Sequence, residues 1–253
     1  MVKEPETVLF EKEKTMSYPL KQEEDNRTAQ RIASKTLDEI RELIVPGMSE
    51  AQIEAMVCEK MIEKGSGPFW YHGVGALVLL GERSTLSLSA RNYQADPENV
   101  LKKRDILTID CSPTFNGQWG DYARTIFLEN GKAVKEEEVS DPEFRQGLEA
   151  ELELHRILRE ELSPDMTYEE VFVILSDKIK ELGFINLDFH GNLGHSIETD
   201  EKKRICLEMG NKKTFREYGK PFTLEPHIAL PDGKFGYKRE NIYLVRDDRF
   251  EEL

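Results

Sequence analysis

A pair of predicted β-hairpins, each with a carboxylate on both arms, is the feature that most restricts how this chain can fold. In the first hairpin, residues 106–110 and 122–128 have the apolar and β-branched composition of strands. An Asn-Gly pair between them is a strong signal for a tight hairpin turn. Asp110 and Asp121 are therefore expected to lie together near the turn end of two paired strands.

The second predicted hairpin comes later in the sequence and repeats this arrangement. Residues 222–224 and 242–245 form apolar, strand-like runs, and the Pro-Asp-Gly of residues 231–233 lies between them. Glu225 follows the first run and Glu240 precedes the second. If the two hairpins face each other, their carboxylates can hold two cations a few ångströms apart, an arrangement that clamps and activates a bridging water.

One histidine completes a set of side chains suited to metal binding. Together the candidate ligands are Asp110, Asp121, His195, Glu225 and Glu240. Carboxylates and a single imidazole are hard, oxygen-rich ligands, which favour Mn, Co, Fe or Zn at a hydrolytic centre over a sulfur-rich structural zinc. Any one of these residues alone is more often a turn or surface residue, so the prediction rests on the whole set.

Composition and charge disfavour several other classes of protein. The formal net charge of −14 disfavours binding to nucleic-acid phosphates. No apolar run approaches the roughly 20 residues of a membrane span, and the first residues lack the apolar core of a signal peptide. The cysteines Cys58, Cys111 and Cys206 are scattered without a Cys-x-x-Cys pair, which indicates reduced thiols and a cytoplasmic location.

Helical patterns indicate one domain built from two similar halves. Residues 1–24 are charged and irregular and are expected to form an N-terminal extension, with residues 25–253 forming a single domain. Apolar residues at helical spacing predict helices over residues 26–44, 50–64, 139–162 and 168–182. Each pair of helices is followed by one of the predicted hairpins, so the order of elements is similar in the two halves.

These motifs resemble those of the creatinase/methionine aminopeptidase family, the pita-bread metallopeptidases, over residues 20–246. The segment Asp121-Tyr-Ala-Arg124-Thr is similar to the family's Asp-x-x-Arg-Thr motif, and Thr-Leu-Glu225-Pro is similar to its Thr-x-Glu-Pro motif. The gap of 15 residues from Glu225 to Glu240 is more similar to proline dipeptidase and aminopeptidase P than to methionine aminopeptidases.

The resemblance implies an α+β pita-bread fold, in which two pseudo-symmetric halves enclose the metal site around a curved antiparallel sheet of the six-stranded type. It also implies a role for each ligand. Asp110 would chelate one ion, and Asp121 and Glu240 would bridge both. His195 and Glu225 would complete the coordination of the other ion.

Two further roles follow from the resemblance. Arg124 is expected to orient a ligand carboxylate from behind the metal site. Glu225 is expected to take and deliver the proton during hydrolysis. The reaction implied is hydrolysis at two divalent ions, as in Xaa-Pro dipeptidases and aminopeptidases, on a short peptide or a small amide-like molecule. A homodimer is left open.

The chain departs from the peptidases where they carry their assisting histidines. Residues 89–93 and 196–204 cover the two regions where the peptidases have such a residue, and neither contains one here. His227 stands where the family usually has glycine after Glu-Pro, and it is a candidate catalytic residue. His72 and His190 are further candidates to replace the missing side chains.

The departures keep other functions open. Tyr93 and Arg91, in one of the regions that lack histidine, are candidates to bind the substrate. A metal site without the peptidase histidines also fits a non-peptidase enzyme on the same scaffold, either a lyase or a creatinase-like hydrolase of C–N bonds. A metal-binding pseudoenzyme is the remaining alternative.

Overall fold

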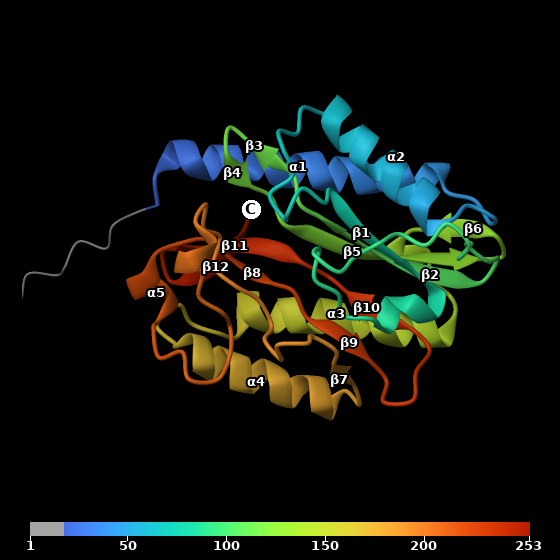
Figure 1. The fold of residues 1–253 in the computed structure, drawn as a ribbon. Helices are drawn as coiled ribbons and strands as arrows, with labels where there is room; N and C mark the ends of the chain where they lie inside the picture. The colour runs from blue at the N-terminus through green and yellow to red at the C-terminus, as the bar shows by residue number, and fades with distance from the viewer. Residues whose placement is uncertain (1–17) are drawn as a thin grey trace, which may run out of the picture.

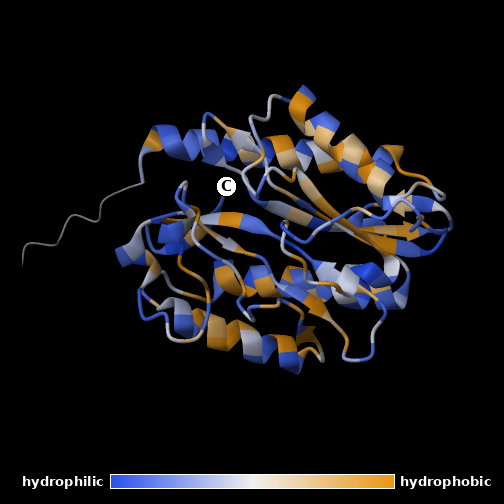
Figure 2. Ribbon diagram, in the orientation of Figure 1, coloured by the Kyte–Doolittle hydropathy of each residue, from blue (hydrophilic) through white to orange (hydrophobic). Residues whose placement is uncertain are grey.

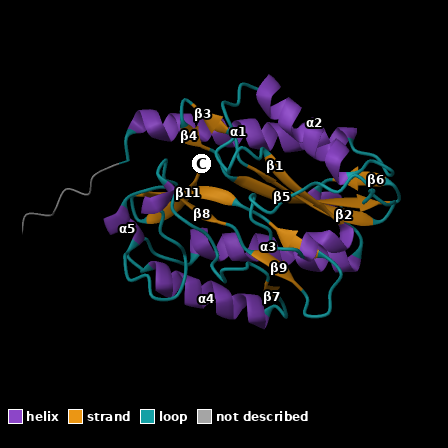
Figure 3. Ribbon diagram, viewed as in Figure 1, coloured by secondary structure: helices purple, strands orange, loops and turns teal. Residues whose placement is uncertain are grey.

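The computed structural model describes residues 18–253 and consists of helices on two sides of antiparallel sheets (Figures 1 and 3). The helices are α1 (Leu20–Leu43), α2 (Glu50–Glu63), α3 (Pro142–Glu160), α4 (Tyr168–Glu181) and α5 (Phe215–Tyr218). The strands of the first half are β1 (Ala76–Leu80), β2 (Asp105–Cys111), β3 (Thr114–Phe115), β4 (Gln118–Trp119), β5 (Tyr122–Glu129) and β6 (Lys132–Val134). Those of the second half are β7 (Ile185–Asn186), β8 (Phe222–Leu224), β9 (His227–Ala229), β10 (Gly236–Lys238), β11 (Asn241–Arg246) and β12 (Arg249–Glu252).

The strands lie in a layer between two pairs of helices (Figure 1). The largest sheet has the order β1-β2-β5-β6, and two three-stranded sheets have the orders β10-β9-β7 and β12-β11-β8. Helices α1 and α2 cover one side, with their own apolar core against β1, β2 and β5. Helices α3 and α4 cover the other side, and a second core lies between them and the strands of the second half. Hydrophobic residues concentrate accordingly on the strands and on the helix faces turned toward them (Figure 2).

Side-chain caps explain where three of the four long helices begin. Ser49 and Thr167 each form a capping box with the residue three positions later, at the starts of α2 and α4. The side chain of Asp141 accepts hydrogen bonds from two backbone amides in the first turn of α3. All four predicted helices are confirmed, and the starts of α2, α3 and α4 are close to those expected.

Helix α1 begins earlier than the apolar pattern indicated. It starts at Leu20, so residues 20–24 of the expected N-terminal extension are helical, while residues 1–17 lie outside the described part of the chain. The first turns are polar and carry no apolar period, but they are held by tertiary ion pairs. Glu23 Oε1 forms an ion pair with Arg246 Nη2 of β11 at 2.6 Å. This contact connects the start of α1 to the second half of the fold.

Both predicted hairpins are present, and each encloses a smaller one. Strands β2 and β5 pair directly, and β3 and β4 form the tip, where Asn116 and Gly117 have positive φ angles of 50° and 76°. Strands β8 and β11 likewise pair, and β9 and β10 form an inner hairpin between them. The inner pair β9/β10 was not predicted. No helix within residues 18–253 is long and apolar enough to cross a membrane.

Candidate metal centre

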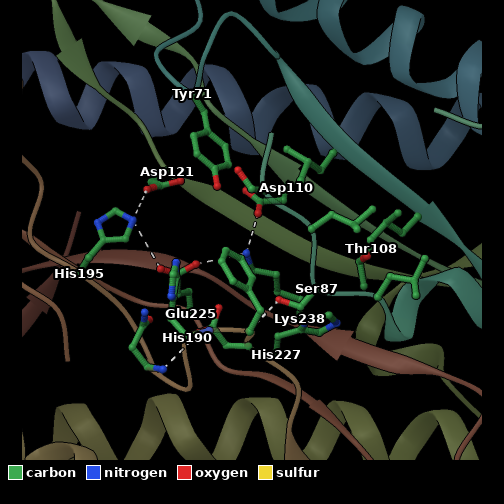
Figure 4. A pocket seen from close by; sticks show the side chains of 18 of the residues that line it. Tyr71, Ser87, Thr108, Asp110, Asp121, His190, His195, Glu225, His227 and Lys238 are labelled. Atoms are coloured by element: carbon green, nitrogen blue, oxygen red, sulfur yellow. Dashed lines mark hydrogen bonds and ion pairs between the residues drawn. The ribbon is translucent and has the colours of Figure 1, made fainter. Parts of the chain in front are cut away.

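The five predicted ligands converge where the two hairpins meet. Asp110 lies on β2, Asp121 just before β5, His195 in an isolated bridge with Cys206, Glu225 just after β8 and Glu240 just before β11. Four of them line a pocket of about 360 Å³, and Glu240 is buried beside them. Figure 4 shows the pocket with Asp110, Asp121, His195 and Glu225 turned into it.

The register of the first hairpin places its two aspartates on the same face. Asp110 pairs directly with Ala123, and Asp121 precedes Ala123 by two positions, so all three side chains point to the same side. Gly120 lets this segment run close to α1, because a Cβ atom there would lie 2.8 Å from the backbone carbonyl carbon of Ala29. Cys111 points to the opposite face and is packed in the core, as its place next to a ligand predicted.

The second hairpin brings four side chains to one face by the same alternation. His227 on β9 pairs directly with Lys238 on β10. Glu225 precedes His227 by two positions, and Glu240 follows Lys238 by two positions, so these residues share a face. The two hairpins are joined by an isolated bridge between Ala123 and Glu240.

The imidazole of His195 is oriented as a metal ligand. Its Nδ1 lies 3.1 Å from the carbonyl oxygen of Ser196, which can only accept, so Nδ1 carries the proton. The Nε2 lone pair then faces Asp121 Oδ2 and Glu225 Oε1, each at 3.5 Å. Burial lowers the pKa of His195 to about 4, so the ring is neutral. A neutral imidazole lone pair that faces two carboxylates at this distance leaves room for a shared cation between them.

The acidic oxygens around His195 lack hydrogen bonds. Asp121 Oδ2 and both carboxylate oxygens of Glu240 are buried and have no partner within the described residues. Burial, and then the neighbouring carboxylates, raise the pKa of Asp121 and of Glu240 well above the usual range. One atom from each of Asp121, His195 and Glu240 lies within 4.8 Å of the others. One nitrogen and several carboxylate oxygens in this arrangement fit a divalent metal ion.

Lys238 is a member of the site that the sequence analysis did not identify. Its Nζ lies 2.5 Å from Asp110 Oδ2, 3.2 Å from Glu225 Oε2 and 3.8 Å from Glu240 Oε2. Burial opposes the charge of this ammonium, but the three carboxylates outweigh it and raise the pKa of Lys238 well above its usual value. Its position two residues before Glu240 in an alternating segment was the available signal.

A comparison with known protein families identifies the family of this chain. The model of metallopeptidase family M24 matches residues 24–247. The chain belongs to metallopeptidase family M24. Probable dipeptidase PepE of Mycobacterium bovis is 25% identical over 236 residues, which cover 89% of this chain and 56% of that protein. A methionine aminopeptidase of Aquifex aeolicus is 21% identical over 220 residues, which cover 84% of this chain and 82% of that protein.

Solved structures confirm the predicted pita-bread fold of this M24 protein. The X-Pro aminopeptidase from Thermotoga maritima has a TM-score of 0.76 at 21% identity, covering 94% of this chain and 62% of that chain. The prolidase from Pyrococcus furiosus has a TM-score of 0.72 at 22% identity, covering 94% of this chain and 65% of that chain. The chain therefore spans between half and two thirds of the length of PepE and of these two peptidases.

The histidines of this M24 protein border the pocket from other positions. His227 is buried, and its Nε2 donates to the carbonyl oxygen of Ser84 at 2.7 Å, which leaves Nδ1 as an acceptor. Burial lowers the pKa of His227 to about 4, so the ring is neutral. His72 and His190 also line the pocket. All three candidate histidines therefore border the pocket.

Arg204 is a second pocket residue that the sequence analysis missed. It lies in the stretch where a histidine was sought, and its guanidinium packs over the rings of Trp70 and Trp119, at 5.2 and 5.5 Å from their centroids. Its Nε and Nη2 atoms are buried and donate no hydrogen bond within residues 18–253. A cation in the pocket lining with two free donors is suited to bind a carboxylate.

The two residues expected to bind substrate lie outside the pocket lining. The hydroxyl of Tyr93 accepts from the backbone amide of Val78 at 2.9 Å and donates to its carbonyl at 3.3 Å, so it holds a loop against β1. Arg91 is exposed and donates from Nε to His72 Nε2 at 3.1 Å. The geometry therefore does not support direct substrate contacts by Tyr93 or Arg91, because their loop folds back on the sheet.

Arg124 was expected to orient a ligand carboxylate, but in the structure it supports the site through backbone carbonyl groups. Its Nη1 donates to the carbonyl oxygens of Ala123 and Glu240 at 2.7 and 2.9 Å. Its Nη2 donates to Asn241 Oδ1 at 2.7 Å. The guanidinium therefore holds together the two strand ends that carry Asp121 and Glu240.

Proposed function

We propose that this chain is a metal-dependent hydrolase that cleaves the amide bond of a short peptide with a free carboxylate. The observation that carries the proposal is the His195 lone pair, which faces the carboxylates of Asp121 and Glu225 at 3.5 Å each. Membership of family M24 and the likeness to the probable dipeptidase PepE support the same reaction class.

Four residues would hold the metal: Asp121, His195, Glu225 and Glu240. A divalent ion bound there polarises a carbonyl group and lowers the pKa of water. Mn, Co, Fe and Zn all accept this mixture of oxygen and nitrogen ligands, and the number of carboxylates makes manganese the first choice for a test.

Glu225 is the proposed proton carrier. Its carboxylate lies between His195 and Lys238, with Oε1 3.5 Å from the ring and Oε2 3.2 Å from the ammonium. Burial alone would raise its pKa, but Lys238 and then His195 bring the pKa of Glu225 below the usual range. Glu225 is thus held as a carboxylate, able to accept a proton and pass it to the leaving amine. The free Nδ1 of His227, two residues away on the same face, is the proposed second acceptor.

Arg204 would bind the carboxylate of the substrate. Its two unpaired donors and its place in the pocket lining allow a charge-assisted contact with a carboxylate. A pocket of about 360 Å³ is near the lower end of the range for small-molecule sites, which suits a dipeptide better than a long chain.

Steady-state kinetics on dipeptides tests the proposal. The metal-free protein is reconstituted with Mn²⁺, Co²⁺ or Zn²⁺ and assayed on Xaa-Pro dipeptides, other dipeptides and peptides that begin with Met. We expect metal-dependent cleavage of dipeptides, with at best slow cleavage of Xaa-Pro dipeptides and weak or absent activity on Met-peptides, because no histidine lies in residues 89–93 or 196–204. Turnover that is unchanged by metal removal, or that is absent from every peptide, would contradict the proposal.

The same missing histidines favour a second candidate. A site that keeps the metal ligands but lacks the peptidase histidines also fits a hydrolase that cleaves C–N bonds of an amidine, or a lyase. If no peptide is cleaved by the metal-loaded protein, the assay is extended to guanidino acids, which carry an amidine carbon and the carboxylate that Arg204 would bind.

A further inference from the structure

We infer that this site takes one divalent ion, and that the ammonium of Lys238 stands where a second ion would otherwise bind. The inference rests on the proposed metal-dependent function and departs from the two ions that the family resemblance implies. It follows from how the acidic oxygens divide between Lys238 and His195 (Figure 4).

Lys238 contacts the carboxylate that would define the second ion. Its Nζ lies 2.5 Å from Asp110 Oδ2, the closest of its ion pairs, and 3.2 Å from Glu225 Oε2. Protein ligands lie about 2.0–2.3 Å from ions such as zinc. A divalent ion on the same Asp110 oxygen would therefore sit against an ammonium, with two positive charges sharing one carboxylate oxygen.

The remaining donors gather around a single point. Asp121 Oδ2 and both oxygens of Glu240 are buried without a hydrogen bond within the described residues, and His195 turns its lone pair toward the same place. The group of ligand atoms within 4.8 Å of one another consists of Asp121, His195 and Glu240, and neither Asp110 nor Glu225, the two carboxylates closest to Lys238, is part of it. Asp110 Oδ2 already has its partner in Lys238. The oxygen and nitrogen atoms that are free to coordinate a metal are thus enough for one ion.

The charges of the site balance with one ion. Asp110, Asp121, Glu225 and Glu240 carry four negative charges when ionised. One divalent ion, the ammonium of Lys238 and the guanidinium of Arg204 supply four positive charges. A second divalent ion would leave two positive charges in excess in a buried site, where unpaired charge is costly.

The backbone of Lys238 is held in place by both hairpins. Strand β10 pairs with β9, so Lys238 lies opposite His227. Its amide donates to Thr125 Oγ1 of β5 at 2.9 Å, and that hydroxyl is itself fixed because it donates to Glu151 Oε1 at 2.6 Å. Because Thr125 shares a face with Asp110 through the β2/β5 register, the ammonium is held opposite that aspartate.

Metal stoichiometry of the full chain tests the inference. Metal-free protein is titrated with Mn²⁺ by calorimetry, and bound Mn is counted by elemental analysis and by electron paramagnetic resonance, which reports spin-coupled pairs. We expect one bound ion without spin coupling in the wild type. Lys238→Met, which removes the charge and keeps the length, is expected to bind two ions. Lys234→Met is the matched control, because that lysine is exposed and pairs only with Glu82 among the described residues, and it should stay at one.

A second variant keeps the test independent of the folding of Lys238→Met. Asp110→Asn should still bind one ion, because Asp110 is engaged by Lys238. Two ions bound to the wild type would overturn the inference and leave the proposed function intact. The same holds if Asp110→Asn then binds one ion fewer than the wild type. A folded Lys238→Met protein that stays at one ion would also overturn it. No bound ion in any variant would contradict both the inference and the proposed function.

Discussion

Ala123 and Glu240 join the two halves of the protein through a pair of backbone hydrogen bonds. The amide of Glu240 donates to Ala123 at 3.0 Å, and the amide of Ala123 donates to Glu240 at 3.4 Å. This bridge brings Asp121, two residues before Ala123, beside the carboxylate of Glu240. The metal centre is thus built at the one backbone contact that the structure describes between β5 and the start of β11.

Replacing Arg124 tests how strongly this junction depends on side-chain support. Arg124→Met removes the donors of the carbonyl oxygens of Ala123 and Glu240 and of Asn241 Oδ1. We expect a loss of about 3 kcal/mol in the free energy of unfolding, because buried acceptors are left unpaired, together with weaker metal binding. Urea unfolding and a metal titration measure both effects. Arg31→Met, at an exposed position on α1, should change neither. Equal stability of the two variants would contradict the role given to Arg124.

Replacing a metal-ligand residue should make the free energy of unfolding independent of added metal. In the wild type, metal at 100 times its dissociation constant is expected to add about 2.7 kcal/mol to the free energy of unfolding. Asp121→Ala should abolish this gain and the hydrolytic activity, and Glu240→Ala should do the same. Asp177→Ala, on the exposed side of α4, is the control and should retain both. Full metal content and turnover in either ligand variant would refute the assignment.

Arg204 should determine affinity for the substrate carboxylate. Arg204→Met is expected to raise KM for a free dipeptide by about 10- to 100-fold, the range for loss of a charge-assisted hydrogen bond, with a smaller change in kcat. The amide of the same dipeptide should be affected little by the substitution. Arg31→Met is the control, since Arg31 is exposed on α1 and its side chain bonds only to Thr28 among the described residues. Equal effects of Arg204→Met on the free and amidated dipeptides would assign Arg204 to the packing of Trp70 and Trp119 instead.

Glu151 predicts a pH dependence of stability that is separate from the metal site. Burial raises the pKa of Glu151 to about 7 from an ordinary value of 4.5, even though Oε1 accepts from Thr125 at 2.6 Å. Because the folded state binds the proton more tightly, Glu151 costs no stability below pH 4.5 and destabilises the fold as the pH rises toward 7 and above.

The substitution Glu151→Gln should remove this dependence. Between pH 5 and pH 8, we expect the variant to gain roughly 3 kcal/mol at most relative to the wild type, measured by urea unfolding of the metal-free protein. Glu149→Gln, at an exposed position of the same helix, should follow the wild type. Parallel pH profiles of wild type and Glu151→Gln would show that the burial of this carboxyl is not what sets the profile.

Local sequence patterns were sufficient for the four long helices and for the two outer hairpins that carry the candidate ligands. Helices α2 and α4 begin where their capping residues Ser49 and Thr167 indicated, because a cap acts within one turn of the chain. The hairpin that carries Asp110 and Asp121 follows from strand alternation and an Asn-Gly turn, which are also local. The start of α1 was placed too late because its first turns are held by Arg246, a contact that no local pattern contains.

The sequence by itself determined the helices and the two hairpins, since hydrophobic period, caps and turns act over a few residues. Its resemblance to a known family implied the pita-bread fold, and the order of five candidate metal ligands gave one prediction for the site. Only the tertiary structure decided what surrounds the ligands. Lys238 lies 128 positions from Asp110 and meets it because β10 folds against β5. Arg204 points into the pocket, while Tyr93 turns back to β1. Such contacts depend on how distant segments pack, and the proposal of a single metal ion depends on those contacts.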